Sequence, residues 1–256
     1  MNYINYLTAI HSSFITDRIF WNNEINRANQ QLPGFNFNPQ GIPWFYAGQL
    51  FDLQNGIIIQ KNDLQEKVFF IAINPKDNND HAGRFHQVES LQSFIDAQNN
   101  YFGYGNKHVT YGRMETIMRM VYQLPINRQI TYPNLHQHAI VFDLIPFHSV
   151  NSATPKHCTY IEERWNNIFS LIREEINPTR RLLIFNGHTA LDYLRQLPNC
   201  IPLNGAIQGV PTPNSCYTFN YQGFLIVVTL GLTVRNANYT ELRDFIVHLI
   251  TNFTAF

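Results

Sequence analysis

Four short apolar segments, each followed by a turn, constrain the fold of this chain more than any other feature. They cover residues 68–73, 139–145, 181–185 and 224–230. Apolar side chains recur at helical spacing in residues 87–99, 111–124, 159–176, 188–197 and 238–253. Continuous apolar strands that alternate with helices predict a parallel sheet buried on both faces. We therefore expect an α/β fold, a three-layer α/β/α arrangement with a central, mostly parallel four-stranded sheet.

The whole chain fits one domain over residues 1–256, in which residues 1–56 form an N-terminal extension. Within the extension, residues 2–31 have the periodicity of one amphipathic helix, which Pro33 and Gly34 end. Residues 34–55 read as an ordered, aromatic-rich loop, either a hydrophobic collar or the wall of a pocket. Residues 198–223 are rich in Pro, Gly and Asn and predict a long loop or hairpin before the last strand.

Charge is scarce and balanced in this sequence. Lys+Arg and Asp+Glu each number 18, charged residues make up 14% and hydrophobic residues 45%. Polarity comes instead from amides, because asparagine alone fills 30 positions. This hydrophobic content excludes a disordered chain. A chain without net charge has little long-range field, so any binding of nucleic acid must rest on local basic groups.

Metal, secretion and membrane signals are weak. The three cysteines, Cys158, Cys200 and Cys216, have no paired spacing, and the ten histidines show no metal-binding pattern. The N-terminus lacks the features of a signal peptide, and the apolar run near 224–232 is too short to cross a bilayer. We expect a cytoplasmic protein with no cofactor, no metal, no membrane contact and no obligate protein partner.

Ligands bind an open parallel sheet at the carboxyl ends of its strands, so the segments after the four apolar runs are the informative ones. They begin at Asn74, Asp143, Asn186 and Gly231. None is a glycine-rich phosphate loop, and none contains the Gly-x-Ser-x-Gly turn of α/β-hydrolases. What remains are amides, a carboxylate and imidazoles, which suit the positioning of a water molecule and hydrogen bonding to a polar heterocycle.

The order of these segments resembles that of the uracil-DNA glycosylase superfamily, especially its mismatch-specific and single-strand-selective branches. Ile71-Ala72-Ile73-Asn74-Pro75 is similar to the first motif of the family, and Val141-Phe142-Asp143-Leu144-Ile145-Pro146 to the second strand motif. The segments 81–86 and 183–190 resemble the base-closing segment and the Gly-Ala strand, and Gly231-Leu232-Thr233-Val234-Arg235-Asn236-Ala237-Asn238 resembles the last motif. The resemblance covers about residues 68–250.

Three positions depart from the family. Lys76 stands where the first motif has Gly, Asp143 where the family reads the base with Asn, and Gly231 where a His or Asn polarises the base oxygen. An ionised Asp143 accepts hydrogen bonds only, so it suits the amino group of a cytosine-type base and repels uracil O4. A buried, protonated Asp143 is the alternative. The departures at Asp143 and Gly231 fit an enzyme for modified bases, such as one that acts in anti-phage defence, rather than a uracil-specific one.

The resemblance implies a set of site residues. Asn74 would orient the attacking water, with Asp143, His148 and His188 as the other catalytic candidates. The base would contact Ile73, Pro75, Lys76, Phe85, Asn186 and Gly231, and the DNA backbone would contact Thr233, Arg235, Asn236 and Asn238. Each has a plainer explanation: Asn74 suits a turn before Pro75, Asp143 a loop cap, Phe85 the core.

The resulting hypothesis is a monofunctional DNA N-glycosylase, a hydrolase that flips a modified or damaged base and leaves an abasic site. Two rival functions stay open. One is an N-glycosidase of free nucleosides or nucleotides, which the zero net charge favours. The other is a non-catalytic binder of modified nucleic acid, which the missing polarising residue at 231 favours.

Overall fold

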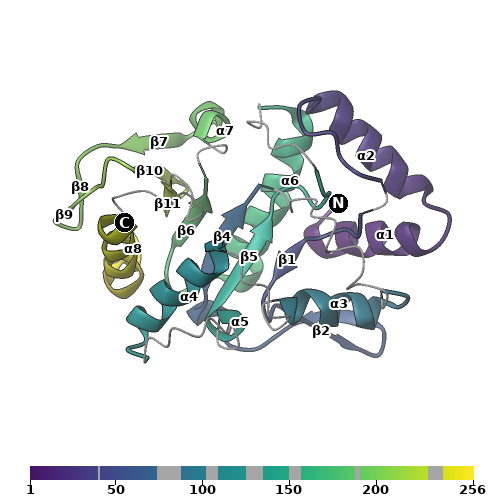
Figure 1. Cartoon of the computed structure of the whole chain (residues 1–256), viewed down its shortest axis with the longest axis horizontal. Helices are drawn as coiled ribbons and strands as arrows, with labels where there is room; N and C mark the ends of the chain where they lie inside the picture. The colour runs from purple at the N-terminus through teal and green to yellow at the C-terminus, as the bar shows by residue number, and fades with distance from the viewer. Residues whose placement is uncertain are drawn as a thin grey trace.

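A computed structural model describes residues 1–39, 41–73, 88–101, 109–124, 135–149, 157–187, 191–229 and 239–256. Within these ranges the main sheet has seven strands in the order β1-β5-β4-β6-β11-β10-β7 (Figure 1). Four of them correspond to the four apolar segments, namely β4 (Val68–Ala72), β5 (Ala139–Asp143), β6 (Leu182–Asn186) and β11 (Phe224–Thr229). The predicted α/β class is confirmed.

The four predicted strands are neighbours and form the parallel part of the sheet. β4 pairs in parallel with β5 on one side and with β6 on the other, and β11 pairs in parallel with β6. The sheet is larger than predicted, because three antiparallel strands extend it: β1 (Tyr46–Ala47), β10 (Cys216–Tyr221) and β7 (Cys200–Leu203). β7 and β10 come from the segment 198–223, which therefore adds to the main sheet.

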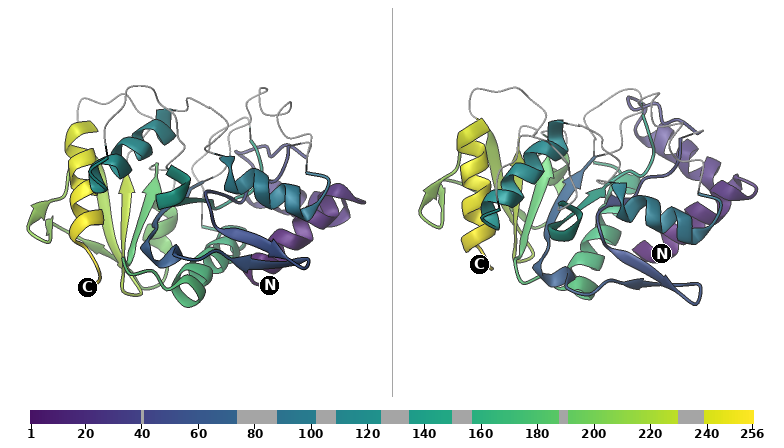
Figure 2. Two further views of the ribbon diagram at one scale, coloured as in Figure 1. Left: turned by 90° about the horizontal axis from the view of Figure 1, so that it is seen from below. Right: turned by 60° about the horizontal axis from the view of Figure 1, so that its bottom comes forward.

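Alternate side chains of the parallel strands pack into two different hydrophobic clusters. In β4, Phe69 and Ile71 belong to one cluster, while Val68 and Phe70 belong to the other. The first cluster includes residues of α1 (Tyr3–Ile15), α2 (Ile19–Gln31), α3 (Leu91–Asn99), α6 (Thr159–Ser170) and α7 (Leu191–Gln196). The second includes residues of α4 (Val109–Val121), α5 (Leu135–His138) and α8 (Tyr239–Asn252). Figures 1 and 2 show α4 and α8 side by side.

The N-terminal region forms two helices, so the prediction of one helix over residues 2–31 was wrong. α1 spans Tyr3–Ile15 and α2 spans Ile19–Gln31. Between them, Arg18 adopts the left-handed conformation with φ 60°. Side chains at the break bind the first amides of α2: Ser13 Oγ accepts from Trp21 N at 3.0 Å, and Asp17 Oδ1 from Ile19 N at 2.9 Å. Such local side-chain acceptors compete with the helical ladder and favour a new helix start.

Short elements complete the described part of the chain. β2 (Phe51–Gln54) and β3 (Ile57–Gln60) form a hairpin across Asn55-Gly56, both with positive φ, as a tight two-residue turn requires. A second small hairpin joins β8 (Ala206–Ile207) and β9 (Val210–Pro211). A 3₁₀ turn covers Leu64–Glu66, and a π-helical segment, Leu171–Ile176, continues α6.

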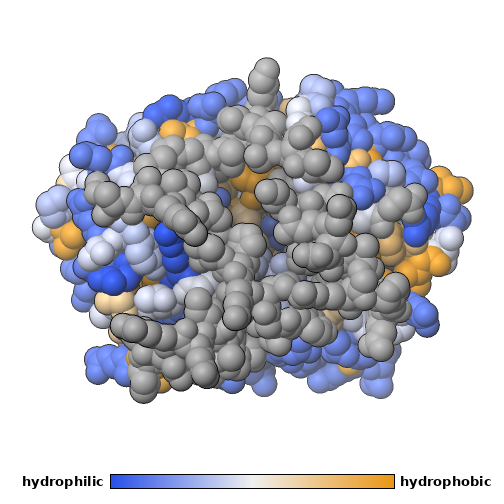
Figure 3. Space-filling view, in the orientation of Figure 1, coloured by the Kyte–Doolittle hydropathy of each residue, from blue (hydrophilic) through white to orange (hydrophobic). Residues whose placement is uncertain are grey.

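The visible described surface in the orientation of Figure 1 is mostly hydrophilic, with hydrophobic residues in small separate groups (Figure 3). A chain with 14% charged residues reaches this polarity through its amides. The large aromatic side chains are instead buried. All six aromatic residues of the segment 34–55 are at most 3% exposed. Their packing fits the collar interpretation of that segment.

Candidate functional site

The carboxyl ends of the four parallel strands meet at one edge of the sheet. β4 comes first in the chain and lies between β5 and β6, so the chain order reverses around it. A reversal of this kind opens a crevice at the strand ends, where ligands of open α/β sheets bind. Adjacent strands lie about 4.8 Å apart, so Asp143 at the end of β5 and Asn186 at the end of β6 are roughly 10 Å apart.

Backbone hydrogen bonds fix the segment after β5 against β4. Asp143 lies opposite Ala72 in the strand register. The pairing continues past both strands, with Leu144 N donating to Ala72 O at 3.0 Å and Ile145 N donating to Ile73 O at 2.8 Å. On the other side, Asp143 N donates to Phe45 O at 2.9 Å. The structure thus brings together Ile73 and Asp143, two of the predicted site residues.

Asp143 is buried, with 6% of its surface exposed. It lines a narrow cavity of about 10 Å³ together with Tyr3, Phe45 and Arg164, among others. Among the described residues no side chain donates a hydrogen bond to its carboxyl group. Burial raises the pKa of Asp143 well above its ordinary value. The environment therefore favours the neutral acid, which can both donate and accept a hydrogen bond.

Replacing Asp143 with Asn should stabilise the protein at neutral pH and not at acidic pH. Because the pKa is raised on folding, the folded state binds more protons above about pH 4, and stability falls as pH rises toward the folded pKa. Each unit of that shift corresponds to about 1.4 kcal/mol. Urea unfolding at pH 4 and pH 7.5 would measure the difference between the two proteins.

The matched control is Asp192→Asn, which removes an exposed carboxylate from α7. Its effect should stay within about 0.5 kcal/mol at both pH values. An Asp143→Asn protein whose advantage over wild type is the same at pH 4 and pH 7.5 would contradict a neutral Asp143.

His148 lies in the segment that follows β5 and is 8% exposed. Its carbonyl accepts from Asn38 N at 2.8 Å, and a Cβ on Gly41 would lie 3.1 Å from the His148 Cβ. Tyr46 lies opposite Phe142, and a bridge joins Phe37 to Ser149, so the aromatic loop and the segment after β5 form one wall beside Asp143. The aromatic loop therefore flanks the segment after β5.

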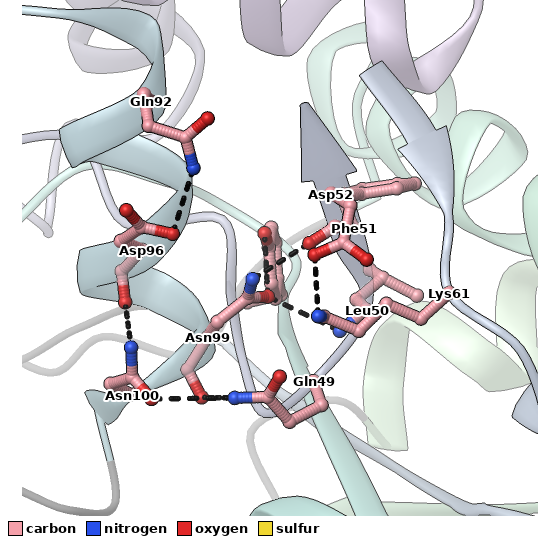
Figure 4. Close-up of polar contacts among 10 residues, drawn as sticks. Gln49, Leu50, Phe51, Asp52, Lys61, Gln92, Asp96, Asn99 and Asn100 are labelled. Atoms are coloured by element: carbon pink, nitrogen blue, oxygen red, sulfur yellow. Dashed lines mark hydrogen bonds and ion pairs between the residues drawn. The ribbon is translucent and has the colours of Figure 1, made fainter. Parts of the chain in front are cut away.

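Two buried amides of α3 hold the aromatic loop in place. Gln98 Oε1 accepts from Phe45 N at 2.8 Å and from Tyr46 N at 3.1 Å. Asn99 Oδ1 accepts from Leu50 N and from the Tyr46 hydroxyl, each at 3.2 Å, and Asn99 Nδ2 donates to Phe51 O at 2.7 Å (Figure 4). Gln98 and Asn99 are 0% and 3% exposed. Neutral amides therefore help to position the aromatic loop next to Asp143.

The other predicted site residues are only partly described. Asn186 ends β6 opposite Thr229 and is half-buried. Ile73 is buried, with 8% of its surface exposed. The remaining predicted positions lie outside the described residues: Asn74, Pro75, Lys76, Phe85, His188, Gly231, Thr233, Arg235, Asn236 and Asn238.

Sequence reasoning missed Arg164, which lines the narrow cavity with Asp143. It lies on α6 among Tyr160, Ile161, Trp165 and Ile168, all buried. The signal was present in the sequence: an arginine at helical spacing within an apolar stripe faces the core, where a charge needs a partner.

In the described part of the chain, no helix is long and apolar enough to cross a membrane. No group of three or more His, Cys, Asp or Glu side chains that could hold a metal ion occurs there either. No protein-family model matches the chain, and no curated protein is significantly similar to it in sequence.

Proposed function

We propose that this chain is a cytoplasmic DNA glycosylase, built as a three-layer α/β/α domain, that removes a modified or damaged base, preferably of the cytosine type. The observation that carries the proposal is Asp143, a buried carboxyl at the carboxyl end of β5 whose pKa burial raises. It stands where the glycosylase motif has Asn. A neutral carboxylic acid, like an amide, offers one donor and one acceptor, so Asp143 can hydrogen-bond to a base edge as Asn does.

The chemistry requires a water molecule, a polarised base and little else. The water oxygen attacks C1′ of the flipped deoxyribose while the C1′–N bond breaks. The electron pair of that bond leaves with the base, and the base takes up the proton that the water loses. The sugar becomes cation-like, so an amide that orients the water suffices. Asn74 follows β4 directly and is our candidate for that role. His148, His188 or backbone amides would stabilise the departing base, since Gly231 has no side chain to do so.

The proposed base choice follows from hydrogen bonding at ring position 4. Neutral Asp143 accepts from an amino group or donates to a carbonyl, whereas ionised Asp143 only accepts. Preference for an amino-bearing base should therefore sharpen as pH rises toward the raised pKa of Asp143. Once Asp143 is ionised, the carbonyl of a uracil-type base is left unpaired in a dry pocket at a cost of about 1–3 kcal/mol, which is about a ten- to hundredfold preference for the amino-bearing base.

The deciding experiment offers the protein oligonucleotides that differ in one base and detects abasic sites by alkaline cleavage. The set contains uracil, cytosine and several modified cytosines, each in single-stranded and duplex DNA, at pH 6 and pH 8.5. We expect cleavage at one or more cytosine derivatives, with a ratio to uracil that grows with pH, and Asp143→Asn should remove that growth. Absence of abasic sites in every substrate would refute the glycosylase proposal.

A second candidate function is hydrolysis of free nucleosides, which the balance of 18 basic and 18 acidic residues favours. DNA binding gains affinity from phosphate contacts with Lys and Arg, and a chain without net charge has few to spare. Incubation with free modified nucleosides, followed by chromatography of the released base, distinguishes the two. Release from nucleosides but not from oligonucleotides would favour this second function.

A further inference from the structure

The N-terminal helix α1 reaches the candidate site through Tyr3. Tyr3 is 4% exposed, and it lines the narrow cavity together with Asp143. Its ring packs edge-on against Phe142, the residue before Asp143, with ring centroids 5.6 Å apart and an interplanar angle of 90°. It packs in the same way against Phe45, at 6.1 Å and 86°. A residue near the start of the chain therefore contacts both segments that meet at Asp143.

The Phe45 carbonyl joins Tyr3 to Asp143. Its oxygen accepts from the Tyr3 hydroxyl at 3.1 Å and from Asp143 N at 2.9 Å. A carbonyl oxygen has two lone pairs, so these two donors satisfy it. On the other side of the residue, Phe45 N donates to Gln98 Oε1 at 2.8 Å. Phe45 is thus fixed by α3 through its amide and by α1 through its carbonyl, and Asp143 N binds to that fixed carbonyl.

The Tyr3 hydroxyl remains protonated, and therefore a donor, near neutral pH. Burial raises the pKa of Tyr3 well above its ordinary value, with smaller contributions from Tyr46 and Asp143, while Arg164 acts in the opposite direction. The contribution of Asp143 indicates that the two side chains are close. The titratable and charged side chains that line the narrow cavity with Asp143 are Tyr3 and Tyr6 from α1 and Arg164 from α6.

Tyr6, one turn further along α1, provides a comparison within the same helix. It is buried and lines the same cavity. Its hydroxyl donates to Glu24 Oε2 at 2.8 Å and lies 3.1 Å from the Tyr160 hydroxyl. These contacts join α1 to α2 and α6. The hydrogen bond of Tyr3 instead joins α1 to the carbonyl that holds Asp143.

We propose that Tyr3 is a positioning residue for Asp143. Its hydroxyl holds the Phe45 carbonyl, and through that carbonyl the main chain of Asp143, at the carboxyl end of β5. Asp143 is thereby kept beside a cavity of only about 10 Å³, which limits its contact with water. The N-terminal helix is then a working part of the site. The effect of Tyr3 on base choice rests on the proposed function, whereas its effect on the protonation of Asp143 does not.

The test is Tyr3→Phe, which removes the hydroxyl and keeps the ring contacts. Loss of this group frees the Phe45 carbonyl and admits water to the enlarged cavity, where a hydrogen bond to the carboxylate favours the ionised form of Asp143. The midpoint of the Asp143 titration, followed by NMR of its carboxyl carbon, should fall by about one pH unit. Asp143→Asn identifies the signal. An unchanged or higher midpoint would overturn the proposal.

Tyr6→Phe is the matched control, since it removes a buried hydroxyl from the same helix and the same cavity. It should leave the Asp143 midpoint at the wild-type value, and an equal fall in both variants would overturn the assignment of Tyr3. If Tyr3→Phe does not fold, the wild-type protein decides. The ring carbon signals of Tyr3 should shift with the midpoint of Asp143, and signals that stay constant through that titration would overturn the proposal.

Base excision supplies a separate measurement. With the oligonucleotide set described above, the rise with pH in the ratio of cytosine-derivative to uracil cleavage should begin about one pH unit lower in Tyr3→Phe than in wild type. Absence of abasic sites with both proteins would refute the proposed function, while the NMR titration would still decide whether Tyr3 positions Asp143.

Discussion

The Asn99→Ala protein should be less stable than wild type by about 3 kcal/mol or more. Asn99 makes three buried hydrogen bonds, to Leu50 N, the Tyr46 hydroxyl and Phe51 O. Alanine leaves all three groups unpaired, and each such group costs about 1–3 kcal/mol when buried. A domain has only about 5–15 kcal/mol of stability, so the loss is a large fraction of the total. Urea denaturation, followed by circular dichroism, would measure it.

The neighbouring amide provides the control for that experiment. Asn100 is exposed, and it makes its contacts with Asp96 O and with Gln49 at the surface. Asn100→Ala should change the free energy of unfolding by no more than about 0.5 kcal/mol. Similar losses in the two variants would mean that burial of Asn99 is not the cause.

Asn74→Ala should lower the single-turnover rate of base excision about 100-fold or more, while the protein keeps its fold. The reason is geometric: water held out of line with the C1′–N bond is a poor nucleophile, and misplacement of a reactant by about 1 Å costs about 100-fold. The measurement is the rate of abasic-site formation with enzyme in excess over DNA. This prediction rests on the proposed function and on the place of Asn74 after β4.

Asn62→Ala is its control, because Asn62 is an exposed amide that precedes β4, whereas Asn74 follows it. It should leave the excision rate unchanged. An Asn74→Ala protein that excises at the wild-type rate would remove Asn74 from the mechanism without affecting the glycosylase proposal itself.

Strands that are buried on both faces could be predicted, because their sequences are almost entirely apolar. β4 and β11 are of this kind: Val68–Phe70 and Phe224–Val228 contain no polar residue. The edge strands could not, because β1 has two residues and β7 contains Pro202. Their strand conformation comes from pairing with β5 and β10, which is a tertiary effect that local pattern does not contain.

The break between α1 and α2 shows the same limit in a helical region. Apolar periodicity runs through residues 2–31, but Ser13 and Asp17 offer acceptors to the amides of α2. Periodicity detects the face of a helix and not the competition between side-chain and backbone acceptors.

The candidate site was predictable in position and not in environment. The rule for strand ends selected Asp143, and its neighbours Ile73 and Phe45 follow from pairing. Burial favours the neutral state of Asp143, and Tyr3 and Arg164 reach the same cavity from α1 and α6. Residues 3 and 164 are far from residue 143 in sequence, so only the folded chain reveals their meeting.

The anchoring of the aromatic loop by Gln98 and Asn99 has a consequence for work in different buffers. Ion pairs weaken as salt screens them, whereas hydrogen bonds between neutral amides and backbone groups do not depend on ionic strength in this way. The loop beside β5 should therefore keep its shape across the salt range that weakens contacts with a polyanion. A salt titration of ligand binding then reports on the ligand's own charges, and not on loosening of the wall next to Asp143.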